Sequence, residues 1–183
     1  MTVQDPYLLP DGLPAPVDDG AADHLTGAEL PDLVLPSSQG AVNVREFEVL
    51  YVYPRTGRPG QPMPPGWDKI PGARGCTPQS CAFRDHHAEL AALCARVAGL
   101  SAQSLADQIE FAQRNHMTFP VISDEWLDLA RDPALPTFDV DGLTLYKRLA
   151  LIAEQARIVK VFYPVFPPDR NAQDVVDWLA AHR

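Results

Sequence analysis

The stretch Gly75-Cys76-Thr77-Pro78-Gln79-Ser80-Cys81-Ala82-Phe83-Arg84-Asp85 combines a strong helix-start signal with two cysteines five residues apart. Thr77 is a favoured N-cap because its hydroxyl accepts a hydrogen bond from a backbone N–H one turn on. Pro78 fits the first helical position, where no N–H is needed. Cys76 is therefore expected just outside, or in the first turn of, a helix N-terminus, which favours an anion such as the reactive thiolate. We interpret this stretch as a redox site.

The spacing of the two cysteines predicts a conformational switch. Positions i and i+5 of a helix lie about 140° apart around its axis. Their Cα atoms also lie beyond the roughly 7 Å that a disulfide can bridge. Cys76 and Cys81 can therefore bond only if the first turns unwind, which predicts a helix that is wound when reduced and locally melted when oxidised. Alternatively, both cysteines are ordinary core residues, as we expect for Cys94 further along the same helix.

A zinc site is a further alternative, because Cys76, Cys81, His86, His87 and Cys94 are close in the sequence. Structural zinc prefers closely spaced cysteine pairs on turns and histidine pairs at fixed spacing. The spacing of five and the adjacent helix faces of the two histidines disfavour zinc.

Composition and charge limit the class of protein. A chain of 183 residues can bury the core of one domain, and 46% hydrophobic with 21% charged residues is ordinary for a globular protein. The longest apolar runs, at 49–53 and 149–153, are strand-sized and too short to span a bilayer. The net charge of −9 and the absence of Lys/Arg clusters argue against nucleic acid and anionic membrane as partners.

The cysteine count points to a reducing compartment. Three cysteines are not a disulfide scaffold, and an odd number leaves at least one thiol free. The N-terminus shows no basic start followed by an apolar block, so we expect no secretory signal and a cytoplasmic protein. Disulfides in such a compartment are usually transient and catalytic.

The chain divides into a leader at 1–36 and a domain at 37–183. The leader is rich in Pro, Asp, Gly and Leu, which predicts extended chain without helix or repeat. Residues 37–40 are expected to form a turn, 42–47 a short strand or the start of a helix, and 48–53 a buried strand closed by Pro54. A Pro/Gly-dense loop at 55–74 is long enough to be functional. Its basic residues and Trp67 either roof the redox site or form a tolerated surface insertion anchored by Trp67.

The remaining residues alternate between helix and strand patterns. The helix after Cys76 is expected to run to about Arg96, with a buried face of Phe83, Leu90, Leu93, Cys94 and Val97. Later elements are expected as strands at 97–101, 119–123, 148–154 and 157–163, helices at 102–115, 124–130 and 171–181, a turn-rich stretch at 132–146, and a tight turn at Gln155. This order predicts one α/β domain whose mixed sheet is covered by helices on both faces.

Arg148 opens an apolar strand and is a candidate site residue. At a strand mouth in an α/β sheet, its side chain would reach the active-site crevice. A guanidinium near Cys76 would stabilise the thiolate and polarise an attacked oxygen. The alternative is a surface arginine at a strand end.

Two segments resemble the atypical two-cysteine peroxiredoxins of the bacterioferritin comigratory, or peroxiredoxin Q, type. They are Tyr51-Val52-Tyr53-Pro54 and Gly75-Cys76-Thr77-x-x-x-Cys81-x-Phe83-Arg84-Asp85. The likeness continues at 119–124, 148–152 and 158–162 and covers roughly residues 30–183. It implies a monomer with a thioredoxin fold that reduces hydrogen peroxide and organic hydroperoxides without metal or other cofactor.

The resemblance also implies a role for each site residue. Cys76 matches the peroxidatic cysteine, Cys81 the resolving cysteine and Arg148 the active-site arginine. The Cys76 thiolate would attack the peroxide and become a sulfenic acid. The helix would then unwind, Cys81 would close a disulfide with Cys76, and a thioredoxin-like protein would reduce it.

The loop departs from the family pattern. In the family, a P-x-x-x-T-x-x-C segment runs directly from strand to cysteine, whereas here the insertion separates Pro54 from Cys76, and Ala73 stands where the threonine or serine is expected. Either Thr56 folds back to supply the hydroxyl or this function is lost, so Pro54 and Thr56 are candidate site residues. Two other functions stay open: a thioredoxin-like disulfide exchanger or redox sensor, and a non-catalytic binding module. A C-x-x-C pair would favour the exchanger, whereas the wider spacing favours a peroxidase.

Overall fold

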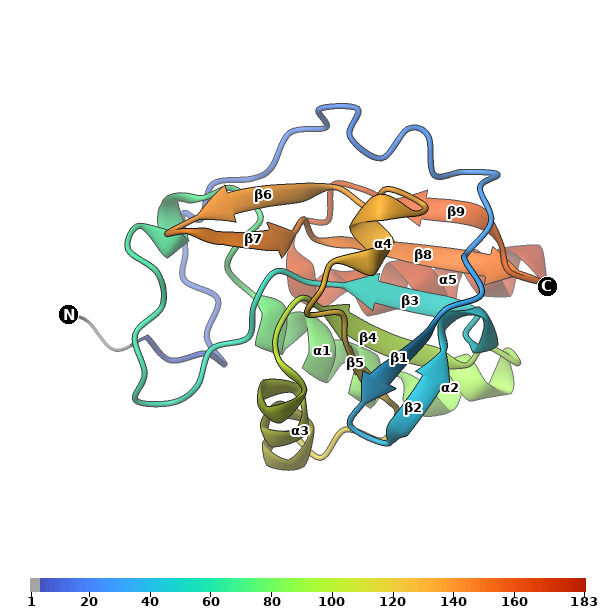
Figure 1. Cartoon of the computed structure of the whole chain (residues 1–183), viewed down its shortest axis with the longest axis horizontal. Helices are drawn as coiled ribbons and strands as arrows, with labels where there is room; N and C mark the ends of the chain where they lie inside the picture. Colours follow the sequence, from blue (N-terminus) through green and yellow to red (C-terminus); the bar gives the residue numbers. More distant parts are fainter. Residues whose placement is uncertain (1–3) are drawn as a thin grey trace.

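A seven-stranded mixed sheet forms the centre of the computed structural model, which describes residues 4–183 (Figure 1). Its strand order is β2-β1-β5-β4-β3-β8-β9. Strands β3, β4 and β5 run parallel, whereas β8 is antiparallel to β3 and β9 to β8. The strands are β1 Val34–Ser37, β2 Gly40–Asn43, β3 Val49–Val52, β4 Val97–Ser101, β5 Val121–Ser123, β8 Leu149–Glu154 and β9 Arg157–Phe162. The α/β class and the mixed sheet are as predicted.

Helices cover both faces of the sheet, but unequally. One apolar core holds buried side chains of α1, α3 and α5, and the other holds those of the short helix α4 and of the leader. The helices are α1 Cys76–Asp85, α2 His87–Ala92, α3 Leu105–Arg114, α4 Asp128–Arg131 and α5 Asn171–His182. Over residues 4–183, no helix has the length and apolar character needed to cross a membrane.

Strand β3 places α1 on the sheet. Its side chains alternate between the two cores, with Leu50 on the leader side and Tyr51 on the helix side. The Tyr51 ring stacks on Phe83 of α1 at a centroid distance of 4.3 Å. Gly99 of β4 leaves room for this ring, because a Cβ there would lie 2.5 Å from the Tyr51 hydroxyl. The aromatic stack thus fixes the helix that carries both cysteines.

The leader is extended, and between residues 4 and 33 it contains no helix, as predicted. Its second half is part of the core, since Leu25 and Leu30 are fully buried. Strand β1 begins at Val34 and pairs with β2 from Gly40, so the expected turn is reduced to two residues. Residues 44–46 form a short 3-10 helix after β2.

The stretch at 132–146 is not merely turn-rich, as the sequence had suggested. It holds a second antiparallel hairpin, β6 Thr137–Val140 and β7 Leu143–Tyr146. Most of its side chains are exposed or half-buried, which weakens the apolar signal of a strand. Trp67 of the loop is buried against this hairpin, with its ring centroid 6.4 Å from that of Phe138.

The helix predicted to start after Cys76 and to run to about Arg96 ends earlier and is interrupted at His86. Leu93 and Cys94 form a Schellman-type end, in which the N–H of Ala95 donates to the Leu90 carbonyl and that of Cys94 to Ala91. Cys94 takes the left-handed position with φ 53°. Its side chain is therefore exposed, and the prediction of a core cysteine was wrong.

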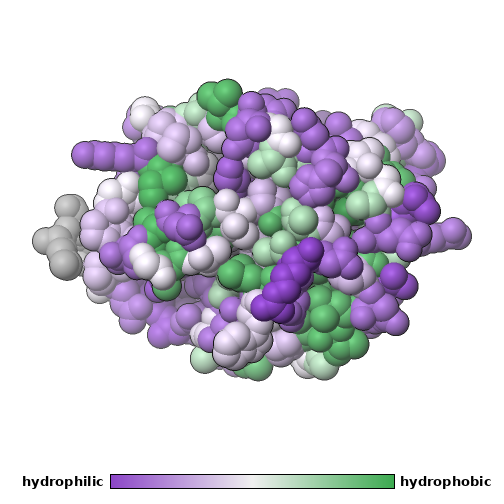
Figure 2. Space-filling model, turned by 45° about the horizontal axis from the view of Figure 1, so that its top comes forward, coloured by the Kyte–Doolittle hydropathy of each residue, from purple (hydrophilic) through white to green (hydrophobic). Residues whose placement is uncertain are grey.

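The C-terminal hairpin follows the prediction, with Gln155 and Ala156 at positive φ between β8 and β9. Helix α5 starts at Asn171, but this residue is its first helical residue and not its cap. On the face drawn in Figure 2, hydrophilic side chains are widely spread and hydrophobic ones lie in separate patches, in keeping with the charged composition.

Candidate active site

Helix α1 begins two residues earlier than the predicted cap at Thr77 implies. Gly75 is the N-cap with φ 105°, and Cys76 is the first helical residue. A Cβ at Gly75 would lie 2.3 Å from Pro168 Cγ and 2.9 Å from Leu9 Cδ2, so only glycine fits here. Thr77 is therefore not the cap, contrary to the prediction, and Pro78 is the third helical residue. Cys76 lies in the first turn, where backbone N–H groups lack partners within the helix.

Cys76 and Arg148 meet in the interior. The Cys76 side chain is 3% exposed, and Arg148, directly before β8, is 4% exposed. Arg148 Nη2 lies 3.2 Å from Cys76 Sγ, and the thiol itself points toward the Ala73 carbonyl at 3.6 Å. The sequence could not establish this contact, which joins residues 72 positions apart.

Backbone carbonyls and the side-chain amide of Gln79 hold the Arg148 guanidinium, and Asn171 in turn holds Gln79. It donates to the carbonyls of Gly72, Ala73 and Arg74 at 3.3, 3.0 and 3.1 Å. Its Nη1 donates to Gln79 Oε1 at 2.5 Å, and Gln79 Nε2 donates to Asn171 Oδ1 at 2.9 Å. No carboxylate pairs with Arg148 within residues 4–183. A thiolate at Cys76 would therefore supply the negative charge that this buried cation lacks.

Cys81 lies on the same helix as Cys76, and both thiols are free. It is half-buried, and its Sγ is 3.8 Å from Asn115 Oδ1 at the end of α3. Burial raises the pKa of the Cys81 thiol above its ordinary 9.0. Because residues 76–85 are all helical, the geometric barrier to a disulfide between Cys76 and Cys81 is present in this state.

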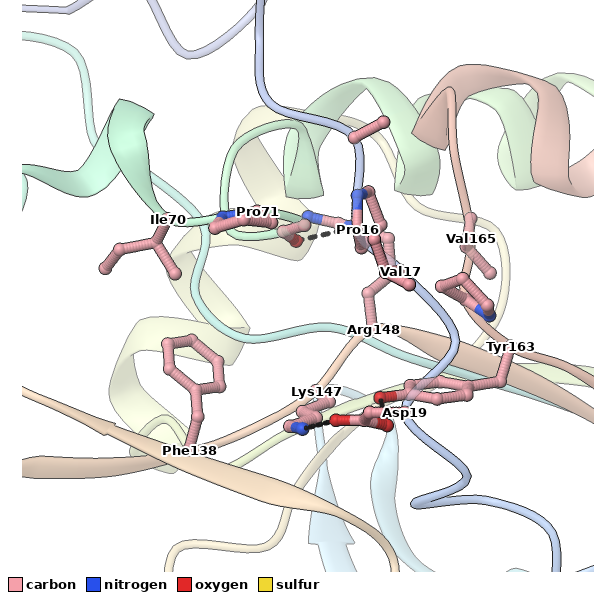
Figure 3. A pocket seen from close by; sticks show the side chains of 13 residues that line it. Pro16, Val17, Asp19, Ile70, Pro71, Phe138, Lys147, Arg148, Tyr163 and Val165 are labelled. Carbon is pink, nitrogen blue, oxygen red and sulfur yellow. Dashed lines mark hydrogen bonds and ion pairs between the residues drawn. The ribbon is translucent and has the colours of Figure 1, made fainter.

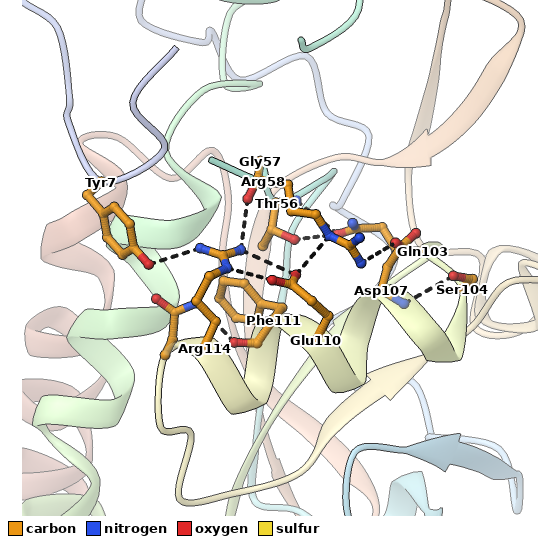
Figure 4. Close-up of polar contacts among 11 residues, drawn as sticks. Tyr7, Thr56, Gly57, Arg58, Gln103, Ser104, Asp107, Glu110, Phe111 and Arg114 are labelled. Atoms are coloured by element: carbon orange, nitrogen blue, oxygen red, sulfur yellow. Dashed lines mark hydrogen bonds and ion pairs between the residues drawn. The ribbon is translucent and has the colours of Figure 1, made fainter. Parts of the chain in front are cut away.

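Among the described hydrogen bonds, none joins the two other candidates to Cys76. Pro54 follows β3, and its carbonyl accepts from Ser101 Oγ at 3.2 Å. Thr56 is buried, and both its backbone N–H and its hydroxyl donate to Gln103 Oε1, at 2.9 and 3.1 Å (Figure 4). The Thr56 hydroxyl is thus directed to the segment before α3, and among the described contacts none joins it to Cys76.

A narrow recess of about 20 Å³ reaches Cys76. By this measure about 10–15 Å³ accommodates one water molecule, so the recess is small. The leader, the 55–74 loop and the start of α1 line it, through Gln4, Pro6, Arg55, Gly57, Arg58, Gln61, Met63, Trp67, Arg74, Gly75, Cys76 and Thr77. Trp67 therefore both anchors the loop and walls the recess.

Two arginines fasten the leader over this recess. Arg74, 9% exposed, donates to Gln4 Oε1 at 2.5 Å and to the carbonyls of Asp5 and Leu8 at 2.6 and 3.1 Å. Arg114 of α3 donates to the Tyr7 hydroxyl at 2.9 Å and to the Gly57 carbonyl at 3.0 Å (Figure 4).

The loop is fastened to α3 as well. Arg58 pairs with Asp107 at 3.4 Å and with Glu110 at 3.1 Å, and Glu110 also pairs with Arg114 (Figure 4). The start of the leader and the loop are therefore held on the same helix.

A larger cavity of about 340 Å³ lies beside Arg148 (Figure 3). Its walls come from the leader, the end of the loop, the β6–β7 hairpin and the segment after β9, and they include Pro16, Ile70, Phe138 and Val165. Arg148 lines this cavity whereas Cys76 does not, so it is separate from the recess at the sulfur.

Sequence reasoning missed Gln79, Asn171 and Arg74, because each acts through contacts distant in sequence. These residues are recognised as part of the site only by their burial and their hydrogen bonds in the folded protein, where Gln79 is fully buried and Asn171 is 1% exposed. Within residues 4–183, no group of three or more His, Cys, Asp or Glu side chains is placed to hold a metal ion.

The sequence is similar to known proteins of one family. The model of the Redoxin family matches residues 25–177. The chloroplastic peroxiredoxin Q of Oryza sativa subsp. japonica is 28% identical over 159 residues, which is 84% of this chain. The chain spans 65% of the length of this rice relative.

Solved structures share the fold. The peroxidoxin BcpB of Mycobacterium tuberculosis superposes with a TM-score of 0.68 at 24% identity, over 86% of this chain and 97% of the other. The bacterioferritin comigratory protein of Xanthomonas campestris gives a TM-score of 0.67 at 22% identity, over 86% and 98%. These likenesses establish the thioredoxin-like fold that the sequence resemblance implied.

Proposed function

Because the chain belongs to the redoxin family, we propose that it is a thiol-dependent peroxidase of the peroxiredoxin Q type, reducing hydrogen peroxide and organic hydroperoxides. The contact between Cys76 Sγ and the buried Arg148 guanidinium, at 3.2 Å, carries this proposal. It places a cation on the one sulfur that begins a helix and opens to a recess. The Xanthomonas campestris relative has alkyl peroxide reduction activity, which supports the substrate class.

The first step oxidises Cys76. The thiolate attacks one peroxide oxygen, the O–O bond breaks, and the other oxygen leaves as water or an alcohol after taking up a proton. Sulfur loses two electrons and becomes a sulfenic acid, while the peroxide is reduced. The Arg148 guanidinium stabilises negative charge on the sulfur before attack and on the oxygen as the bond breaks.

The second step forms a disulfide. The first turns of α1 unwind, and the Cys81 thiolate attacks the sulfenic sulfur. The S–S bond forms, the S–O bond breaks, and the oxygen leaves as water after taking up the proton that the Cys81 thiol released. A dithiol protein of the thioredoxin type then reduces the disulfide by exchange. Since both cysteines belong to one helix, we propose that the protein works as a monomer in the reducing environment of the cytoplasm.

The test is peroxide consumption with a thioredoxin system by wild type, Cys76→Ser and Cys81→Ser. We expect Cys76→Ser to lose activity, and Cys81→Ser to react once with peroxide and then fail to turn over. Mass spectrometry after one equivalent of peroxide should show a disulfide between Cys76 and Cys81 in wild type only. Full activity of Cys76→Ser would refute the mechanism. Insulin reduction without peroxide consumption would favour a disulfide exchanger.

A further inference from the structure

The residue three positions before Cys76, near the end of the inserted loop, cannot provide the hydroxyl that the family pattern places there. Ala73 stands three residues before Cys76, and it offers the sulfur a backbone carbonyl. Thr56, the alternative from the sequence, gives its hydroxyl to Gln103. A water-poor site solvates the charge that develops on the leaving oxygen only through its own groups, so a hydroxyl in the recess would add a second donor to the Arg148 guanidinium.

Thr77 has a buried hydroxyl without a partner. Its side chain is 1% exposed, and its Oγ1 makes no hydrogen bond to the described residues. An unsatisfied buried hydroxyl costs about 1–3 kcal/mol, so such groups call for an explanation. Thr77 also lines the recess that reaches Cys76.

The other unpartnered hydroxyls do not compete for this role. Tyr51 and Ser80 lie close enough to interact, although they form no hydrogen bond of good geometry. Neither residue lines the recess at Cys76. Thr77 is therefore the one described residue that combines an unpartnered buried hydroxyl with a place in the wall of this recess.

We propose that Thr77 is a catalytic residue, whose hydroxyl donates a hydrogen bond to the peroxide bound in the recess beside Cys76. This inference rests on the proposed peroxidase function and deepens it. The hydroxyl keeps its proton throughout: it orients the peroxide for attack and stabilises the oxygen that separates from the sulfur-bound one. The hydrogen-bonding group usually supplied before the cysteine is here supplied directly after it.

The test compares Thr77→Val, which removes the hydroxyl at nearly constant volume, with Thr77→Ser, which keeps it. The second-order rate constant of Cys76 oxidation by hydrogen peroxide is measured for each, together with the rate of Cys76 alkylation by iodoacetamide. Alkylation needs no donor to a leaving oxygen of a peroxide, so it reports whether the sulfur itself is intact. Thr144→Val, at an exposed position of strand β7, is the matched control.

We expect Thr77→Val to lower the peroxide rate constant by about 10²-fold, the usual effect of removing one such donor. Alkylation should stay near the wild-type rate, and Thr77→Ser should restore most of the peroxide reaction. The proposal is overturned if Thr77→Val keeps the peroxide rate, if it lowers peroxide and iodoacetamide rates equally, or if Thr56→Val alone has the effect. A wild type that consumes no peroxide would instead refute the proposed function.

Discussion

At the scale of single residues, the site is built around a buried cation. Arg148 satisfies its donors with three backbone carbonyls, Gln79 and Cys76 Sγ. Carbonyls and an amide carry no full negative charge, so a thiolate at Cys76 would be the one full negative charge in contact with the guanidinium among these partners. The sequence suggested Cys76 and Arg148 individually, from a helix start and a strand start. The contact between Cys76 and Arg148 is a tertiary contact, and so are the hydrogen bonds by which Gln79 and Asn171 hold Arg148 in place. No local sequence pattern predicts these contacts.

The Cys81 thiol gives a pH-dependent prediction. Burial raises its pKa above 9.0 in the wound helix, and unwinding returns it toward that value. Below pH 9 the thiol is neutral in both forms, so its contribution favours the wound helix in full. As the pH rises through 9 and toward the raised pKa, the thiol ionises in the unwound form before it does in the wound helix. Ionisation lowers the free energy of the unwound form, so the stabilisation of the wound helix by the neutral thiol is lost.

The measurement compares thermal melting of reduced wild type and of Cys81→Ser, which has no thiol to titrate. We expect the melting temperature of wild type to fall relative to that of Cys81→Ser as the pH rises through about 9. Parallel curves over this range would show that burial of Cys81 does not couple to the helix.

At the scale of elements, the predictable parts are those with a strong local pattern. Strand β3 is apolar at every position and is closed by Pro54, and the turn at Gln155 separates two clear strand patterns. The β6–β7 hairpin escaped prediction because its side chains are mostly exposed or half-buried. The end of α2 also escaped, since Cys94 takes the left-handed position that glycine usually fills.

The leader and the loop form part of the site only through contacts with residues distant in the sequence. Residues 4–9, which we call the strap, contact Arg74, Arg114 and the N-cap Gly75, and two of them line the recess at Cys76. In sequence this segment is only Pro-rich extended chain. Its role depends on partners more than 60 residues away.

Removing the strap should open the recess. A variant lacking residues 1–9 loses Gln4 and Pro6 from the wall and Leu9 from Gly75. We expect Cys76 in this variant to react at least about tenfold faster with a bulky maleimide, because local opening is no longer needed for access. The rate with iodoacetamide should rise less, since this reagent is small.

Tyr7→Phe is the matched control for this deletion, because it keeps the strap and removes one hydroxyl that accepts from Arg114. Its maleimide rate should lie close to that of wild type. Equal reactivity of the deletion variant and wild type toward maleimide would mean that the strap does not limit access to Cys76.

At the scale of the whole molecule, the switch should be local. The sheet is buried on both faces, and every residue of β3, β4 and β5 is buried. Helix α1 packs on the outside of this sheet, and unwinding it costs the contacts of one helix.

Amide hydrogen exchange, measured before and after one equivalent of peroxide, tests whether only α1 unwinds. Amides at 76–85 should exchange much faster in the disulfide form, while those of β3, β4 and β8 keep their protection. Cys81→Ser, treated in the same way, should keep α1 protected because no disulfide can form there. Loss of protection throughout the sheet, or none in α1, would contradict a local switch.

The carbonyls of Gly72, Ala73 and Arg74 have one more consequence, for how this loop can change in evolution. These carbonyls accept hydrogen bonds from the guanidinium of Arg148. The last residues of the loop, directly before Cys76, are therefore held in place by Arg148 and not by the strand that precedes the loop. Residues further upstream can then be added or lost without moving the sulfur, since surface loops tolerate changes in length at small entropic cost. A sequence signature that requires a fixed distance between strand and cysteine would overlook chains of this kind, whereas one anchored on the arginine and the helix would find them.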